Sequence, residues 1–219
     1  MNENLRLMEF YFPLLDNFGD QHWWPAETQF EVIVGAVLAQ FTSWRNAAKA
    51  VNNLKEENLM DISELHKATL DQVKDLIHPA GYYNRKAQII KNVLNYIVDN
   101  FDGNLEKMFK LEDNELRKGL LTIKGVGKET ADSILLYSGN KNIFVVDAYT
   151  RRIFSRTGHI KGTEEYDQIQ KLFVSNIPCD VKLYNQYHAL IVKLGSDVCL
   201  KRNPRCGECP INNLCKKNF

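Results

Sequence analysis

The chain has 219 residues, a formal net charge of +1 and 44% hydrophobic residues, which is the composition of an ordinary globular protein. This near-neutral charge does not exclude a nucleic acid partner, because acidic residues elsewhere can offset a local basic face. No run of about 18 apolar residues occurs, so no membrane-spanning helix and no membrane partner are expected. The N-terminal segment lacks the basic, apolar and small-residue order of a signal peptide, so we expect a cytoplasmic protein.

Helical periodicity dominates the chain and predicts an all-α protein. The apolar runs at 32–37 and 143–147 could be strands, but they are too few and too isolated to build a sheet. Ser43, Thr69 and Asn84 are expected to cap three of the helices. Apolar spacing and capping residues predict helices over 5–17, 28–41, 43–54, 70–77, 84–100, 112–121, 128–137, 148–156, 164–175 and 180–198.

The C-terminal segment holds four of the five cysteines, namely Cys199, Cys206, Cys209 and Cys215. Thiolates at such spacing bind Zn²⁺ or an iron–sulfur cluster. Zinc ribbons usually use two separated pairs of close cysteines, whereas only one close pair occurs here. The spacing therefore favours a cluster and leaves zinc, or no metal, as the alternatives. The fifth cysteine, Cys179, is expected to be a buried thiol.

A glycine turn, GVG at 125–127, separates the helices expected at 112–121 and 128–137. Val126 can point inward while the amides of the turn point outward, which is a way to bind phosphate without contacting a base. The alternative is a tight turn between two helices. Further along, Asp147 stands directly before the helix at 148–156 and is expected to be its N-cap. A carboxylate fixed in that way could stabilise a developing cation.

Together these segments resemble the helix-hairpin-helix (HhH-GPD) DNA glycosylases of the endonuclease III superfamily. The similarity extends to AVLAQFT at 36–42, GYYNRKA at 81–87 and the cysteine spacing, which is similar to that family's [4Fe–4S] loop. It implies two all-α domains. One is a six-helix barrel over 24–138 with the helix-hairpin-helix at about 112–138; the other joins 1–23 to 139–219 and carries the cluster loop at 199–215.

The resemblance also implies an activity, which is to flip a damaged nucleotide out of double-stranded DNA and to hydrolyse its N-glycosidic bond. Asp147 matches the catalytic aspartate. Gln40 matches the residue that fills the gap left by the flipped base, and Tyr82 matches a wedge into the opposite strand. Phosphate contacts are expected from Gly125, Val126, Gly127, Lys128 and Arg151. We expect a DNA-associated monomer of prokaryotic type.

Residue 129 bears on whether the enzyme also cuts the DNA strand. Members with lyase activity carry a lysine at the position of Glu129, and that lysine attacks the sugar. Lys128 stands at the neighbouring position and points about 100° away on a helix, so it cannot replace that lysine. The resemblance therefore implies base release without lysine-dependent lyase activity.

The expected base pocket combines Glu129 with Trp23, Trp24 and Trp44. An anion and electron-rich rings suit cationic bases, so N-alkylated purines such as 3-methyladenine are the expected substrates. The tryptophans and the glutamate resemble the branch of 3-methyladenine DNA glycosylase III. Ordinary packing of the tryptophans is the alternative. A uracil, thymine-mismatch or other-lesion glycosylase stays open, as does a non-catalytic lesion-sensing DNA-binding protein.

Overall fold

The computed structural model describes residues 7–219, and every regular element among them is a helix, which confirms the all-α prediction. The run at 32–37 lies inside a helix, and residues 143–147 are irregular. None of the described helices is long and apolar enough to cross a membrane. The helices group into two compact units. We call Trp24–Lys141 the hairpin unit, and we call the chain up to Trp23 together with Asn142–Phe219 the cysteine unit.

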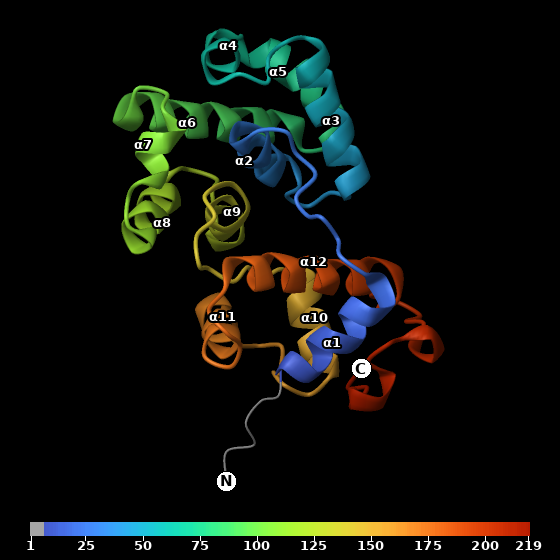
Figure 1. Ribbon diagram of the computed structural model, residues 1–219. Helices are drawn as coiled ribbons and strands as arrows, with labels where there is room; N and C mark the ends of the chain where they lie inside the picture. The colour runs from blue at the N-terminus through green and yellow to red at the C-terminus, as the bar shows by residue number, and fades with distance from the viewer. Residues whose placement is uncertain (1–6) are drawn as a thin grey trace. The chain divides into compact units, whose positions relative to one another are not determined.

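The hairpin unit is built around one long helix, α6 (Tyr83–Phe101), which packs against α2, α4, α5 and α7 (Figure 1). Helix α2 is buried from Phe30 to Leu38, as its continuous apolar sequence predicted. The other elements of this unit are α2 (Gln29–Leu38), α3 (Trp44–Glu56), α4 (Ile62–Lys67), α5 (Leu70–Ile77), the 3₁₀ turn η1 (His78–Ala80), α7 (Leu105–Phe109), α8 (Asp113–Thr122), α9 (Lys128–Ser133) and the π-helical turn η2 (Ile134–Ser138).

In the cysteine unit, α12 (Val181–Asp197) packs against both α1 (Leu7–Phe18) and α10 (Ala148–Arg156) (Figure 1). Phe173 of α11 (Tyr166–Val174) stacks on Phe144 with ring centroids 4.2 Å apart, and Tyr187 donates a 2.6 Å hydrogen bond to the carbonyl of Leu7. Two 3₁₀ turns, η3 (Cys206–Glu208) and η4 (Asn212–Leu214), lie in the tail. Cys179 is exposed, so its prediction as a buried thiol was wrong.

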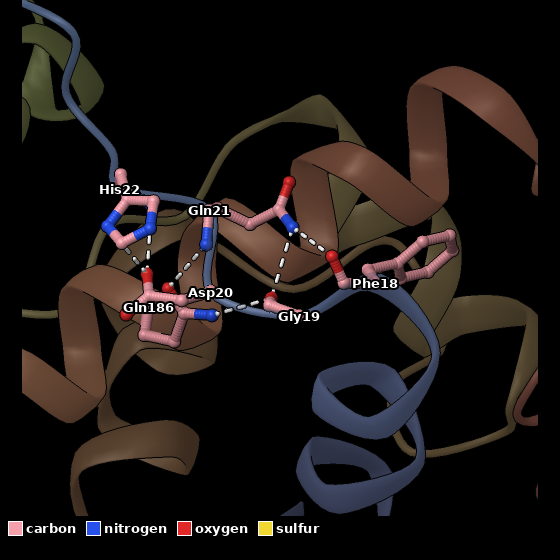
Figure 2. A network of polar contacts seen from close by, with 6 residues as sticks. All are labelled: Phe18, Gly19, Asp20, Gln21, His22 and Gln186. Atoms are coloured by element: carbon pink, nitrogen blue, oxygen red, sulfur yellow. Dashed lines mark hydrogen bonds and ion pairs between the residues drawn. The ribbon is translucent and has the colours of Figure 1, made fainter.

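The segment after α1 is tied to α12 by a polar network (Figure 2). Gln186 of α12 accepts from the backbone N–H of Gln21 at 3.2 Å and donates to the carbonyl of Gly19 at 3.1 Å. The Gln21 side chain donates back to Phe18 at 2.9 Å. These bonds satisfy the last turn of α1 and fix the chain just before Trp23.

Of the N-caps predicted at Ser43, Thr69 and Asn84, two are present in the structure. Ser43 caps α3, and Thr69 forms a capping box with Gln72 at the start of α5. The third prediction was wrong: Asn84 lies within α6, whose N-cap is Tyr82 in the left-handed conformation. Helix α2 also ends at Leu38, earlier than predicted, because Phe41 adopts a φ of +53° that no helix can continue through.

Candidate active site

Asp147 is the N-cap of α10, as its position before the helix predicted. Three buried apolar residues, Phe144, Val145 and Val146, precede it, so the carboxylate lies at the edge of the core. Oδ1 accepts a hydrogen bond from the backbone N–H of Thr150 at 2.7 Å and another from its Oγ1 at 2.8 Å. This cap fixes a side chain that is only 10% exposed.

The other carboxylate oxygen of Asp147 faces His188 of α12, with Oδ2 3.6 Å from Nε2. Burial raises the pKa of Asp147, but contacts from His188 and Thr150 outweigh that effect and hold the pKa of the carboxyl below its ordinary value. The carboxylate is therefore ionised at neutral pH. A fixed anion in a poorly solvated setting can stabilise a positive charge that develops beside it.

His188 is a site residue that the sequence did not reveal. It lies on the buried face of α12 with Tyr184, Tyr187 and Ile191, so helical spacing alone marks it as a core residue. Only its contact with Asp147 distinguishes it from the other core residues on this face. The two residues are far apart along the chain, so a single sequence cannot show the contact.

The two glycines of the hairpin serve different purposes. Gly125 has a φ of +100°, and a Cβ added there would lie 2.4 Å from Cγ1 of Ile89 in α6. Gly127 is the N-cap of α9 with a φ of −96°, and a Cβ there would meet nothing within 4 Å. Val126 between them is 7% exposed and points inward, as predicted. Gly125 is thus needed for packing, whereas Gly127 leaves open space beside the turn.

Polar contacts hold the hairpin in place. Nε2 of Gln40 donates to the carbonyl of Gly125 at 3.3 Å and to Oγ1 of Thr130 at 2.9 Å, so the segment after α2 is bonded to the turn. Arg117 of α8 binds the fully buried Asp132 of α9 through two hydrogen bonds of 2.6 and 3.0 Å. Such a bidentate ion pair fixes one helix of the hairpin against the other.

Lys128 and Glu129 form the first turn of α9. Lys128 is half-buried and Glu129 is exposed, so the two neighbours occupy different environments. The helix continues directly into η2, whose wider turn carries Tyr137. π-helical turns are frequent at functional sites.

Trp24 and Trp44 come together in the hairpin unit, with ring centroids 5.0 Å apart and planes at 89°. Tyr137 extends the group, with its ring 5.3 Å from that of Trp24. Gly35 of α2 makes room for the indole, because a Cβ there would lie 3.2 Å from Cζ2 of Trp24. Both tryptophans are half-buried. Trp23 is the last residue of the cysteine unit before the chain passes into the hairpin unit.

The remaining DNA-binding candidates differ in their surroundings. Tyr82 is 70% exposed at the start of α6. Arg151 donates to the backbone carbonyls of Gly162 at 3.3 Å and Glu164 at 2.5 Å, so its guanidinium holds a loop of its own unit. That contact occupies part of its donor capacity, and its predicted phosphate contact stays a prediction.

The four tail cysteines, Cys199, Cys206, Cys209 and Cys215, line one cavity in the cysteine unit. Several donors among the described residues point at their sulfur atoms. Nη1 of Arg156 lies 3.2 Å from Sγ of Cys199, and the backbone N–H of Lys217 lies 3.4 Å from Sγ of Cys215. Hydrogen bonds to the cysteine sulfurs help to set the reduction potential of iron–sulfur clusters, so this donor set fits such a cluster. No three His, Cys, Asp or Glu side chains within residues 7–219 are grouped to hold a single metal ion.

Comparison with known families decides the assignment. Residues 34–179 match the model of the HhH-GPD superfamily base excision DNA repair proteins. The chain belongs to this superfamily. Residues 199–215 match the iron–sulfur binding domain of endonuclease III, which confirms the predicted cluster and sets zinc aside. The protein is a base excision repair DNA glycosylase of the endonuclease III family with a [4Fe–4S] cluster, and Cys199, Cys206, Cys209 and Cys215 would hold it.

Relatives and solved structures agree with this assignment. A protein of Methanocaldococcus jannaschii, provisionally named a DNA repair glycosylase, is 49% identical over 95% of both chains. The structure of an H. pylori 3-methyladenine DNA glycosylase bound to 1,N6-ethenoadenine is similar at a TM-score of 0.73, with 28% identity over 84% of this chain and 92% of that one. A non-covalent endonuclease III–DNA complex reaches a TM-score of 0.84, with 20% identity over 99% of this chain and 97% of that one.

Proposed function

We propose that this glycosylase is monofunctional and releases N-alkylated purines such as 3-methyladenine from double-stranded DNA. Glu129 carries the proposal, because it stands in the first turn of α9 where the resemblance puts the attacking lysine of the lyases. Lys128 lies next to it but in a different, half-buried environment. A carboxylate cannot form a Schiff base with the sugar, so the reaction would end with base release.

The base pocket would combine Glu129 with the rings of Trp24 and Trp44. The two rings meet edge to face, both residues are half-buried, and aromatic faces attract cationic rings. N-alkylated purines are cationic and leave readily, so they need little acid catalysis. Glu31, the acid in α2, supports this choice, since its carboxylate is buried and bound to Lys55 at 3.1 Å and is not available to protonate a base. Trp23 belongs to the cysteine unit, and its expected role in base binding stays a prediction.

Asp147 would be the catalytic residue. Its ionised carboxylate would stabilise the oxocarbenium-like sugar that forms as the base leaves, and His188 would hold the carboxylate in its charged form. The amides of Gly125 and Gly127, with Lys128 and Arg151, would contact phosphates. The N–H of Val126 instead donates to the carbonyl of Ile123 at 3.0 Å, so Val126 would act by shaping the turn. Gln40 would fill the gap that the flipped nucleotide leaves, and Tyr82 would wedge into the opposite strand.

The two compact units support the domain division that the resemblance implies. The hairpin unit would be the barrel domain expected over 24–138, and the cysteine unit would be the cluster domain expected over 1–23 and 139–219. The protein would act as a monomer on damaged duplex DNA. The [4Fe–4S] cluster would hold its four-cysteine loop in place, and no step of base release is assigned to it.

The test is to treat duplex DNA with a methylating agent, incubate it with the purified protein and separate the released bases by chromatography. We expect 3-methyladenine or 7-methylguanine from the wild type and neither from Asp147→Asn, which should still bind DNA. Equal release by the variant would refute the mechanism. A brown colour shows that the iron–sulfur cluster is present. If such a preparation binds DNA but releases no methylated base, the substrate assignment is wrong. Uracil and thymine mismatches are then the next substrates.

A further inference from the structure

Two exposed aromatic rings lie next to each other in the hairpin unit. Phe41 is 85% exposed, the highest value among the large hydrophobic side chains of the described residues, and Tyr82 is 70% exposed. Their ring centroids are 6.4 Å apart and their planes meet at 67°. They come from two segments distant in sequence, the turn after α2 and the start of α6, so the pairing is a product of the fold.

Both rings are carried on unfavourable backbone. Phe41 has a φ of +53° and Tyr82 a φ of +47°, a region that bulky side chains rarely adopt. Gly81 directly before Tyr82 also has a positive φ, of +67°. Such conformations persist only where the surrounding structure enforces them, and they gather at functional sites.

Lys86 is hydrogen-bonded to both of the turns that carry the rings. It is 1% exposed, and its Nζ donates to the carbonyl of Leu38 and to that of Ala80, each at 2.8 Å. The first carbonyl ends α2 just before Phe41, and the second lies just before Gly81 and Tyr82. One buried ammonium therefore joins the two turns that carry the rings.

The surroundings of the pair indicate what the rings would meet. Gln40, next to Phe41, is bonded to the glycine turn of the hairpin. Arg45 and Arg85 are exposed in the first turns of the helices that follow Phe41 and Tyr82. Exposed rings flanked by cations and lying close to a phosphate-binding turn suit an unstacked region of DNA, where bases stack on aromatic side chains.

We infer that Phe41 and Tyr82 form a two-ring wedge that enters the duplex at the lesion, and that Lys86 is the positioning residue that sets its spacing. This rests on the proposed function for DNA binding and adds Phe41 and Lys86 to the residues that perform it. Each ring contributes stacking, so loss of either is expected to weaken binding to distorted DNA by roughly tenfold.

The test uses a duplex with a tetrahydrofuran abasic-site analogue and a neighbouring 2-aminopurine, whose fluorescence rises when it is unstacked. We expect the wild type to bind this duplex more tightly than an undamaged one and to raise the fluorescence. Phe41→Ala and Tyr82→Ala should each lose about tenfold in affinity and most of the fluorescence rise. Phe12→Ala is the matched control, since Phe12 is 56% exposed on the cysteine unit and should behave as wild type.

Lys86→Met keeps both rings but removes the tie. Lys86→Met should lose the fluorescence rise, and Lys86→Arg should keep part of it. If Lys86→Met does not fold, Phe41→Ala and Tyr82→Ala decide the test. If Phe41→Ala keeps the wild-type affinity and fluorescence, the inference is wrong. It is also wrong if the wild type is a dimer in solution and Phe41→Ala is a monomer, because the rings would then form a protein interface. A wild type that does not prefer the abasic duplex would instead refute DNA lesion binding itself, and this inference with it.

Discussion

Substituting the hairpin glycines one at a time should separate folding from DNA binding. In Gly125→Ala the new Cβ would lie 2.4 Å from Cγ1 and 2.7 Å from Cδ1 of Ile89, and the residue would keep a φ of +100°. The backbone conformation costs about 1–2 kcal/mol for a residue with a Cβ. Overpacking against α6 costs about 1–3 kcal/mol more. We therefore expect the hairpin unit to lose about 2–5 kcal/mol of unfolding free energy.

Gly127→Ala is the matched control at the other end of the same turn. Its Cβ would meet nothing within 4 Å and its φ of −96° suits any residue. The loss of stability should stay under about 1 kcal/mol, the cost of alanine at an N-cap. The added methyl group would, however, stand in the open space beside the turn amides. Loss of one hydrogen bond to phosphate should weaken DNA binding roughly tenfold.

Urea unfolding followed by circular dichroism and tryptophan fluorescence measures the first effect, and titration of a fluorescent duplex at fixed salt measures the second. Salt must be constant because phosphate contacts make affinity depend on it. The reasoning is refuted if Gly127→Ala loses as much stability as Gly125→Ala. It is also refuted if Gly127→Ala binds DNA as tightly as the wild type, because the open side of the turn would then have no role in binding.

Three other changes test the site. Glu129→Lys returns an amine to the first turn of α9 and should produce a covalent DNA complex on borohydride treatment, whereas the wild type should give none. His188→Gln removes a contact that holds the pKa of Asp147 low, so the acidic limb of the pH–rate profile should move to higher pH; an unchanged limb would contradict the role of His188. Cys206→Ser should lose iron and brown colour and lower the thermal midpoint of the cysteine unit, and iron analysis beside the melting curve tests this.

Local sequence signals were enough for several helices that begin with a side-chain cap. The capping box of Thr69 and Gln72 starts α5, and Asp147 starts α10, at the predicted residues. The same holds for the inward Val126, because the pattern of two glycines around one apolar residue is a local one. Helices α4 and α7 escaped prediction, since five or six residues are too few to establish a helical period.

Features that depend on distant contacts could not be predicted. Asn84 is a residue type that commonly caps helices, yet α6 begins one residue earlier, at Tyr83. Lys86 of this first turn binds the carbonyls of Leu38 and Ala80, which lie outside the helix. The pairing of His188 with Asp147 is hidden in the same way. In each case one polar side chain crosses between segments, and its partner is defined only once the helices have packed.

The buried charge of Lys86 is itself a measurable property of the hairpin unit. Burial lowers the pKa of its ammonium from 10.5 to about 8, so between these values the unfolded chain binds more protons than the folded one. Stability should therefore rise with pH across that window, and the burial of the charge costs about 3 kcal/mol below it, at 1.36 kcal/mol for each pKa unit. Lys86→Met should remove this rise in urea unfolding between pH 8 and 10.5; a rise that persists in the variant would contradict the argument. A charge that costs stability and yet joins the two ring-bearing turns is best explained by the geometry that it enforces.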